Sequence, residues 1–297
     1  RPELPDDDVA DVLLAGQSEL DSGNHDRALT YANRGLTLAR DPLRRARLCL
    51  LLGDVHHDRA AMLPASENYY AALTNAEGSA TLRATAVVRL ARRWSDPGRL
   101  DAEVLRFLRD ALADLVAIGD ADGQARELRL LVSAHLAHKS NMARPAVGDT
   151  EIALAHAVLA ELRPHDRGEL VCEVLTECRW ALYDFAPPEE ILRLSRWMAG
   201  AAVTPDVPEH FKGEALIALI IDQLRAGDLQ QAKASIEEHR RRTTRSNHGL
   251  MPWLQATLDN LADLWHGHFE AATQRLYGPS QRLLDQLGSA RTGDSLW

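Results

Sequence analysis

The sequence predicts an all-α fold in which antiparallel helix pairs stack into a solenoid. Long stretches rich in Ala, Leu and Arg carry little Gly or Pro, which favours helices along most of the 297 residues. A 34-residue pattern of small and large residues can be read near the start of the chain, and one turn pattern occurs three times. We expect about fifteen or sixteen helices.

The clearest repeat covers Ala46–Ser79. If Ala46 is position 1, the pattern positions 7, 8, 20, 24 and 27 hold Leu52, Gly53, Ala65, Tyr69 and Ala72. Gly53 and Ala65 are small, so we expect two antiparallel helices to cross there, with Leu52 and Tyr69 filling the space beside them. This spacing resembles that of a tetratricopeptide repeat.

An earlier and weaker match covers Val9–Pro42. With Gly16 at position 8, Ala28 falls at position 20, whereas position 24 holds Ala32 instead of a large residue. Pro42 is the last residue of the unit, just past the end of its second helix, because a helix has to stop before a proline. We therefore interpret this stretch as the first repeat.

The repeat signal returns late in the chain as a G-x-x-x-x-A turn. LRAGDLQQA carries Gly227 and Ala232, and LWHGHFEAA carries Gly267 and Ala272, 40 residues further on. DSGNHDRA at residues 21–28 has the same turn. Glycine ends a helix in a conformation that other residues resist, and the small alanine lets the next helix pack closely. The period drifts from 34 to about 40, as in a degenerate array.

The middle of the chain divides the array. The segment 140–148 (SNMARPAVG) is the least helical interior stretch, so we expect repeats over residues 1–139 and 149–297, either continuous or jointed there. The other helices are predicted at residues 80–95, 100–118, 123–139, 149–162, 166–185, 189–202, 208–226, 229–244, 251–266 and 269–287.

Composition limits the classes of function. A net charge of −9 and a pI near 5.7 argue against direct contact with a nucleic-acid backbone, and no apolar run approaches the ~20 residues that span a membrane. No signal peptide is apparent, and Cys49, Cys172 and Cys178 are an odd set inside helical patterns. We expect buried, reduced cysteines in a cytoplasmic protein. The chain starts at Arg1, which we interpret as an excised piece, and an exposed end repeat would favour a homodimer.

A larger family resemblance rests on Arg179-Trp180, on the segment APPEEILRLSRWMAGAA and on the two late turns. From about Leu100 onward the chain resembles the tetratricopeptide-type region of large bacterial transcriptional regulators. These are the ATP-binding (STAND) LuxR-type activators and the antibiotic-pathway activators with a bacterial transcriptional activation domain. The resemblance implies a right-handed superhelix that acts as a sensor or interaction arm on separate ATPase and DNA-binding modules. The sequence has neither a G-x-x-x-x-G-K-[ST] loop nor a basic recognition helix.

Three polar motifs have ordinary structural interpretations. Asp7, Asp8 and Asp11 spell D-D-x-x-D, which would suit Mg²⁺ in a helical prenyl or terpenoid synthase, but no second metal motif follows, so we favour an acidic helix start. The histidine pairs lack an H-E-x-x-H motif or a close third ligand, so we expect surface or groove histidines and no metal site; the pairs are His56/His57, His135/His138 and His266/His268. The basic run 239–245 ends a helix and is expected to be solvated.

Aromatic residues supply the best candidate groove. Arg179, Trp180 and Tyr183 share one predicted helix, and Trp253 and Trp265 come from another. Aromatic and arginine side chains on the concave face of a solenoid could hold a small molecule or a peptide, although packing between helices is the alternative for each of them.

The predicted function is therefore non-catalytic. We expect a sensor and protein-interaction domain that binds an effector or a partner in its groove and controls the modules attached to it, with no cofactor. No G-x-S-x-G elbow or reactive-cysteine signature indicates an enzyme. A free-standing adaptor that binds a partner's peptide is the alternative, and a helical Mg²⁺-dependent prenyl or terpenoid enzyme is a remote one.

Overall fold

A computed structural model of the chain describes residues 6–59, 61–92, 101–119, 123–142, 149–163, 165–205, 207–243 and 251–282. All regular elements in these ranges are helical, and none of the helices there is long and apolar enough to cross a membrane. The chain forms two compact units: unit 1 comprises the described residues up to Arg92 together with Asp101–Val132, and unit 2 begins at Ser133. Each unit is described by itself.

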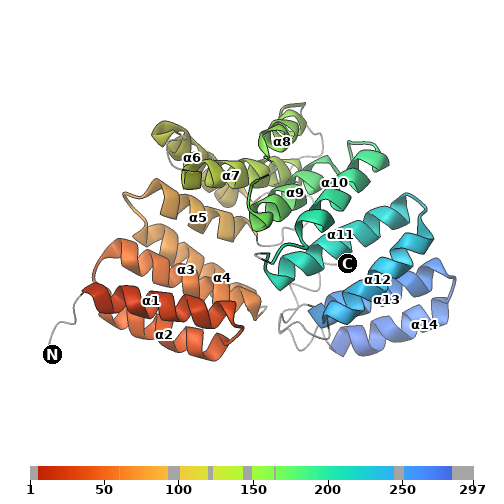
Figure 1. Ribbon diagram of the computed structural model, residues 1–297, viewed down its shortest axis with the longest axis horizontal. Helices are drawn as coiled ribbons and strands as arrows, with labels where there is room; N and C mark the ends of the chain where they lie inside the picture. Colours follow the sequence, from red (N-terminus) through yellow and green to blue (C-terminus); the bar gives the residue numbers. More distant parts are fainter. Residues whose placement is uncertain are drawn as a thin grey trace. The chain divides into compact units, whose positions relative to one another are not determined.

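Unit 1 consists of six helices and the first half of a seventh, drawn in red to olive in Figure 1. The helices are α1 (Asp6–Asp21), α2 (His25–Leu38), α3 (Pro42–Asp58), α4 (Met62–Asn75), α5 (Ala80–Ala91), α6 (Ala102–Ile118) and α7 (Gly123–Met142). From α1 to α6, each helix packs against the next along the chain. Short turns at residues 22–24, 39–41 and 76–79 join α1 to α2, α2 to α3 and α4 to α5, so these pairs are antiparallel.

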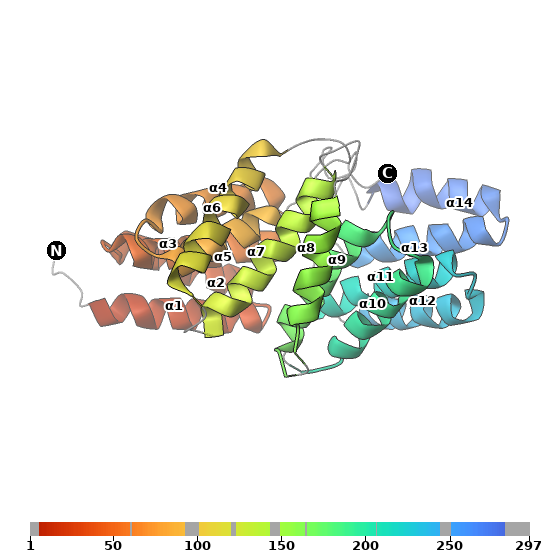
Figure 2. The same ribbon diagram turned by 90° about the horizontal axis from the view of Figure 1, so that it is seen from above.

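Unit 2 contains the second half of α7 and seven further helices, seen in green to blue in Figure 2. They are α8 (Asp149–Glu161), α9 (Gly168–Leu182), α10 (Pro188–Ala201), α11 (Glu209–Arg225), α12 (Leu229–Thr243), α13 (Met251–Trp265) and α14 (Phe269–Arg275), followed by a π-helical turn at Leu276–Ser280. From α8 to α14 each helix again packs against its neighbour in sequence.

Alternate helices form a second set of contacts. In unit 1, α1 packs against α3 and α3 against α5; in unit 2, α9 packs against α11 and α11 against α13. These contacts between odd-numbered helices place them in one layer, with the even-numbered helices behind. An all-α stack of helix pairs in two layers agrees with the predicted solenoid architecture.

Close packing in the clearest repeat depends on a glycine. A Cβ built on Gly53 of α3 would clash with three atoms of the Tyr69 ring on α4, so only glycine lets the ring lie there. The Tyr69 hydroxyl donates to Asp54 over 2.9 Å, and Arg89 of α5 pairs with the same carboxylate oxygen over 2.9 Å. Burial, followed by the Asp54 charge, raises the pKa of Tyr69, so the phenol stays protonated. The Tyr69–Asp54 hydrogen bond thus joins α4 to α3, and the Asp54–Arg89 ion pair joins α3 to α5.

The first repeat is packed in a similar way. A Cβ on Gly16 of α1 would lie 2.7 Å from a methyl carbon of Leu51 in α3. Ala28 and Ala32 of α2 are fully buried in one apolar cluster with Leu51 and Leu52. In the next repeat, Ala65 and Ala72 are buried beside Tyr69.

The three glycine turns have the same backbone geometry. Gly23, Gly227 and Gly267 have φ values of 74°, 78° and 75°, in the left-handed region that disfavours other residues. The amide after each glycine donates to the carbonyl five residues earlier over 2.8–2.9 Å: Asn24 to Glu19, Asp228 to Gln223 and His268 to Asp263. The alanines five residues after these glycines are buried; they are Ala28, Ala232 and Ala272. One turn is therefore used at three places.

Several predicted boundaries differ from the structure. Helix α5 ends at Ala91, where the prediction continued to residue 95, and α9 spans Gly168–Leu182 within the predicted 166–185. Helix α7 continues to Met142, so residues 140–142 of the expected joint are helical, while residues 143–148 lie outside the described part; the division between the two units falls inside α7, after Val132. The helix expected over 269–287 changes to a π-helical turn at Leu276, because Pro279 has no amide hydrogen to continue the α-helical bonds. Residues 283–287 lie outside the described part.

Candidate functional site

Helix α9 carries the most unusual side chains of unit 2. Its sequence GELVCEVLTECRWAL is mostly apolar, and the helix is covered by α8, α10 and α11, which accounts for the burial of its aliphatic residues. Glu173, Glu177 and Arg179 are nevertheless buried on this helix. A buried charge is costly unless it is paired, so the partners of these three residues define the site.

Arg179 is held by a carboxylate from another helix. Its Nε and Nη2 atoms each donate over 2.6 Å to Asp222 of α11, which gives a two-pronged pair with both side chains 2% exposed. The Ser195 hydroxyl of α10 donates to the same carboxylate. Helices α9, α10 and α11 are therefore joined through Asp222. Arg179 is paired with this buried carboxylate and does not line an open groove.

A second ionic group joins α9 to the second half of α7. Nε2 of His135 lies 3.1 Å from Glu173, and its Nδ1 lies 3.0 Å from Glu177 in an ion pair that lacks hydrogen-bond alignment. His138 approaches the same Glu177 oxygen, with Nδ1 at 2.6 Å. We call His135, His138, Glu173 and Glu177 the histidine–glutamate cluster. One turn further along α7, the Asn141 amide donates over 2.6 Å to the Ala181 carbonyl.

The cluster shifts the pKa values of its two histidines in opposite directions. Burial lowers the pKa of His135, but the charges and hydrogen bonds of Glu177 and Glu173 raise it by more, so its pKa lies above the ordinary 6.5. Burial also lowers the pKa of His138, and there Glu177 offsets only part of the effect. Burial raises the pKa of Glu177, yet both histidines lower it by more, to well below 4.5. The cluster thus favours the Glu177 anion, the imidazolium form of His135 and the neutral ring of His138.

The predicted groove residues of α9 lie together beside this cluster. The Trp180 ring stacks near His138 with centroids 6.3 Å apart, and Tyr183 lies 5.2 Å from Trp180. The Arg179 guanidinium lies 5.0 Å from the Trp180 ring and 4.9 Å from the Tyr183 ring, and Arg225 of α11 covers Tyr183 at 3.9 Å. Trp180 and Tyr183 remain partly exposed, so they are the accessible members of this set.

The other two predicted groove residues belong to α13. Trp253 is 2% exposed and is part of the core, whereas Trp265 is 48% exposed at the end of the helix. Leu264 and Phe269, which flank the Gly267 turn with Trp265, are exposed as well. All five predicted groove residues therefore come from α9 with its C-terminal cap, or from α13, which are both odd-numbered helices.

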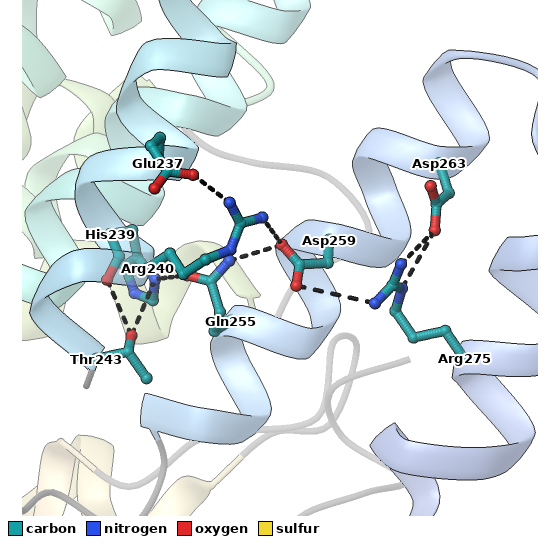
Figure 3. A network of polar contacts seen from close by, with 8 residues as sticks. All are labelled: Glu237, His239, Arg240, Thr243, Gln255, Asp259, Asp263 and Arg275. Atoms are coloured by element: carbon teal, nitrogen blue, oxygen red, sulfur yellow. Dashed lines mark hydrogen bonds and ion pairs between the residues drawn. The ribbon is translucent and has the colours of Figure 1, made fainter.

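The basic run at the end of α12 is only partly solvated: Arg240 and Arg241 are exposed, His239 is buried, and residues 244 and 245 lie outside the described part. Figure 3 shows the acidic partners of Arg240 and of Arg275. Arg240 pairs with Glu237 on its own helix and with Asp259 of α13, and Gln255 donates to Asp259 over 2.7 Å. Arg275 of α14 binds Asp263 over 2.8 Å and reaches Asp259 at 3.9 Å. Arg241 and Arg242 pair with Glu238 on α12. These arginines link the last three helices.

Several sequence-based expectations change with these positions. The expectation of a surface or groove location is wrong for His135 and His138, which are 0% and 9% exposed and bind buried carboxylates. Sequence reasoning did not single out Glu173, Glu177 or Asp222. The signal for the two glutamates was a charged residue inside an apolar helical run, at i, i+4 spacing on α9. Asp222 likewise follows an apolar run on α11. Cys49, Cys172 and Cys178 are buried and unbridged, as expected.

No part of the described structure supplies a metal-binding group of three or more His, Cys, Asp or Glu side chains. Asp11 of the D-D-x-x-D motif is exposed on α1, and the side chains of Asp7 and Asp8 lie outside the described part. Helix α1 begins at Asp6, so Asp7 and Asp8 belong to its first turn and Asp11 to its second.

Comparison with known proteins gave no relative: no protein-family description matches the chain, and no curated protein matches it.

Proposed function

We propose that this chain is a non-catalytic sensor and protein-interaction module of a bacterial transcriptional regulator. In this proposal it is a tetratricopeptide-type array with a right-handed superhelix, and it acts in the cytoplasm on separate ATPase and DNA-binding modules. The family resemblance of Arg179-Trp180, the Pro188 helix start and the late turns supports the regulator context.

The observation that carries the proposal is the layer of odd-numbered helices. Contacts link α9 to α11 and α11 to α13. In a curved stack of helix pairs, the more closely spaced layer is the inner one, so we assign the odd-numbered helices to the concave side of each unit. Trp180, Tyr183 and Trp265 are partly exposed residues of that layer in unit 2 and would contact an effector or a partner.

The mechanism is a shift in population. A ligand that prefers one curvature of the array stabilises that curvature and so changes the state of the attached modules. The ligand needs no catalytic group, and the buried pairs Arg179–Asp222 and His135–Glu173 hold the helices that present its contacts.

Thermal unfolding against a panel of acyl-CoAs, nucleotides, sugars and pathway metabolites tests the proposal. A compound at 100 times its Kd adds about 2.7 kcal/mol to stability. A selective shift that Trp265→Ala abolishes, and that Trp197→Ala on the even-numbered helix α10 leaves intact, supports an effector sensor. Trp197 is a matched control because 42% of it is exposed. A shift that both variants retain contradicts a role for Trp265.

The exposure of Leu264, Trp265 and Phe269 around one turn favours a second candidate, an adaptor that binds a peptide segment of a partner protein. The same panel separates the two candidates, because an adaptor shows no shift with any small molecule. A homodimer through one end of the array is the simplest self-association, and sedimentation at several concentrations measures it.

A further inference from the structure

The histidine–glutamate cluster has a geometry that a single proton can change. Each ring nitrogen of His135 faces a different carboxylate, Glu173 at 3.1 Å and Glu177 at 3.0 Å, and the ring is fully buried. An imidazolium places one positive charge between the two carboxylates, with a hydrogen bond to Glu173 and an ion pair to Glu177. A neutral imidazole has only one N–H, so it turns a lone pair towards the other carboxylate, with no water to screen the repulsion.

We propose that His135 is a proton-dependent latch. While its ring carries two protons, it fastens the second half of α7 to α9 through Glu173 and Glu177, and the loss of one proton loosens that contact. This inference goes beyond the proposed function, because it adds a pH response that is independent of any effector.

The position of His135 in α7 explains why the loss of its contact with α9 loosens α7 locally. Helix α7 belongs to both compact units, with residues 123–132 in unit 1 and 133–142 in unit 2. Within unit 2, His135, His138 and Asn141 all bind α9, so they hold this half of the helix to its neighbour. Loss of the His135 contact leaves the other two, which favours a loosened α7 over global unfolding.

Among the charged residues on the helices around His135, Glu173 and Glu177 are the ones that contact its ring and raise its pKa. On α7 itself, His138 shares Glu177, and Lys139 acts on His138. On α11, Asp222 is bound by Arg179 of α9. The flanking helices α8 and α10 carry His156 and Glu190, which lie 3.9 Å from each other, and α8 also carries Glu151.

The direction of the pH response follows from proton linkage. The pKa of His135 is raised in the folded chain, so its stabilisation is complete below the ordinary value of 6.5 and is lost as the pH rises through the folded pKa. The pKa values of His138, His56 and His239 are lowered, so these residues lose their stabilisation as the pH falls below 6.5. The raised pKa values of Cys49 and Cys178 matter only above about 9. Among the described residues whose pKa is shifted, His135 is therefore the one that predicts a fall in stability between pH 6.5 and 9.

Urea unfolding between about pH 5.5 and pH 8.5 tests the latch in the wild-type chain, His135→Gln and His138→Gln. We expect the wild-type folding constant to fall above pH 6.5, by at most about tenfold per pH unit, since one proton is involved. His135→Gln should remove this fall. His138→Gln is the matched control, because it removes a neighbouring histidine that binds the same carboxylate but titrates on the acid side, so the fall should remain. An unchanged alkaline fall in His135→Gln overturns the latch.

Two measurements on the wild-type chain keep the proposal testable if His135→Gln does not fold. The assigned His135 ring signals should titrate in NMR with a midpoint above 6.5, and a midpoint below that value overturns the proposal. Amide hydrogen exchange of residues 133–142, corrected for the intrinsic effect of pH, should be faster at about pH 8.5 than at about pH 6, while α6, which carries no histidine, is unchanged. Equal protection of residues 133–142 at the two pH values overturns it as well.

Discussion

Asp222 of α11 accepts two hydrogen bonds from Arg179 of α9, and only 2% of either side chain is exposed to solvent. A pair this deeply buried contributes little net stability compared with an apolar pair, but the loss of one partner leaves an uncompensated charge in the core. The pair therefore fixes how α9, α10 and α11 meet, because Ser195 of α10 also donates to Asp222.

Replacement of this aspartate should be strongly destabilising. Asp222→Asn keeps the shape of the side chain but removes the counter-charge of Arg179, and we expect a loss of about 3–5 kcal/mol in the free energy of unfolding. Urea denaturation measures it. The control is Asp110→Asn, which breaks an exposed pair with Arg106 on α6 and should change stability by less than about 1 kcal/mol. Equal effects of the two variants would contradict the role given to the buried pair.

The approach of α4 to α3 is tested at a glycine. Gly53→Ala pushes a methyl group into the Tyr69 ring, and overpacking of this kind costs about 1–3 kcal/mol. Gly200→Ala is the matched control, because Gly200 also lies in a helix but has no atom within 4 Å of a built Cβ. There the substitution should be neutral or stabilise by up to about 1 kcal/mol. Thermal melts of the two variants should shift in opposite directions or by clearly different amounts.

How much of this structure the sequence predicts depends on how far apart the interacting residues lie along the chain. Pro188 and the glycine turns mark helix ends locally, so the start of α10 and the ends of α11 and α13 were predicted within one residue. Likewise, the spacing of Gly53 and Tyr69 reflects two helices that are adjacent in sequence. By contrast, His135 meets Glu173 across 38 residues, and Arg179 meets Asp222 across 43. Spacing alone does not show which helices face each other at such separations.

The histidines show the same limit at the candidate site. An i, i+3 pair on a helix shares one face, which the sequence reveals for His135 and His138. Whether that face meets water or a buried carboxylate depends on α9, which lies elsewhere in the chain. The exposure of the aromatic residues was harder still to predict. Trp253 and Trp265 lie on one helix, yet Trp253 is buried and Trp265 is half-exposed.

The repeated turn gives a further prediction. Gly227→Ala places a side chain in the left-handed region and should cost about 1–2 kcal/mol, whereas Gly227→Asn should cost less, since asparagine tolerates this conformation better. Chemical denaturation of both variants measures the difference. A turn that tolerated alanine as well as asparagine would show that backbone conformation is not what selects glycine there.

The most direct test of the proposed binding face is a hydrogen-exchange footprint. The chain is measured alone and with the compound from the acyl-CoA, nucleotide, sugar and metabolite panel that raises its melting temperature most. We expect slower exchange in the odd-numbered helices of unit 2, above all at the C-terminal ends of α9 and α13, which carry Trp180, Tyr183 and Trp265. Protection confined to the even-numbered helices α10, α12 and α14 would contradict the assignment of the binding face.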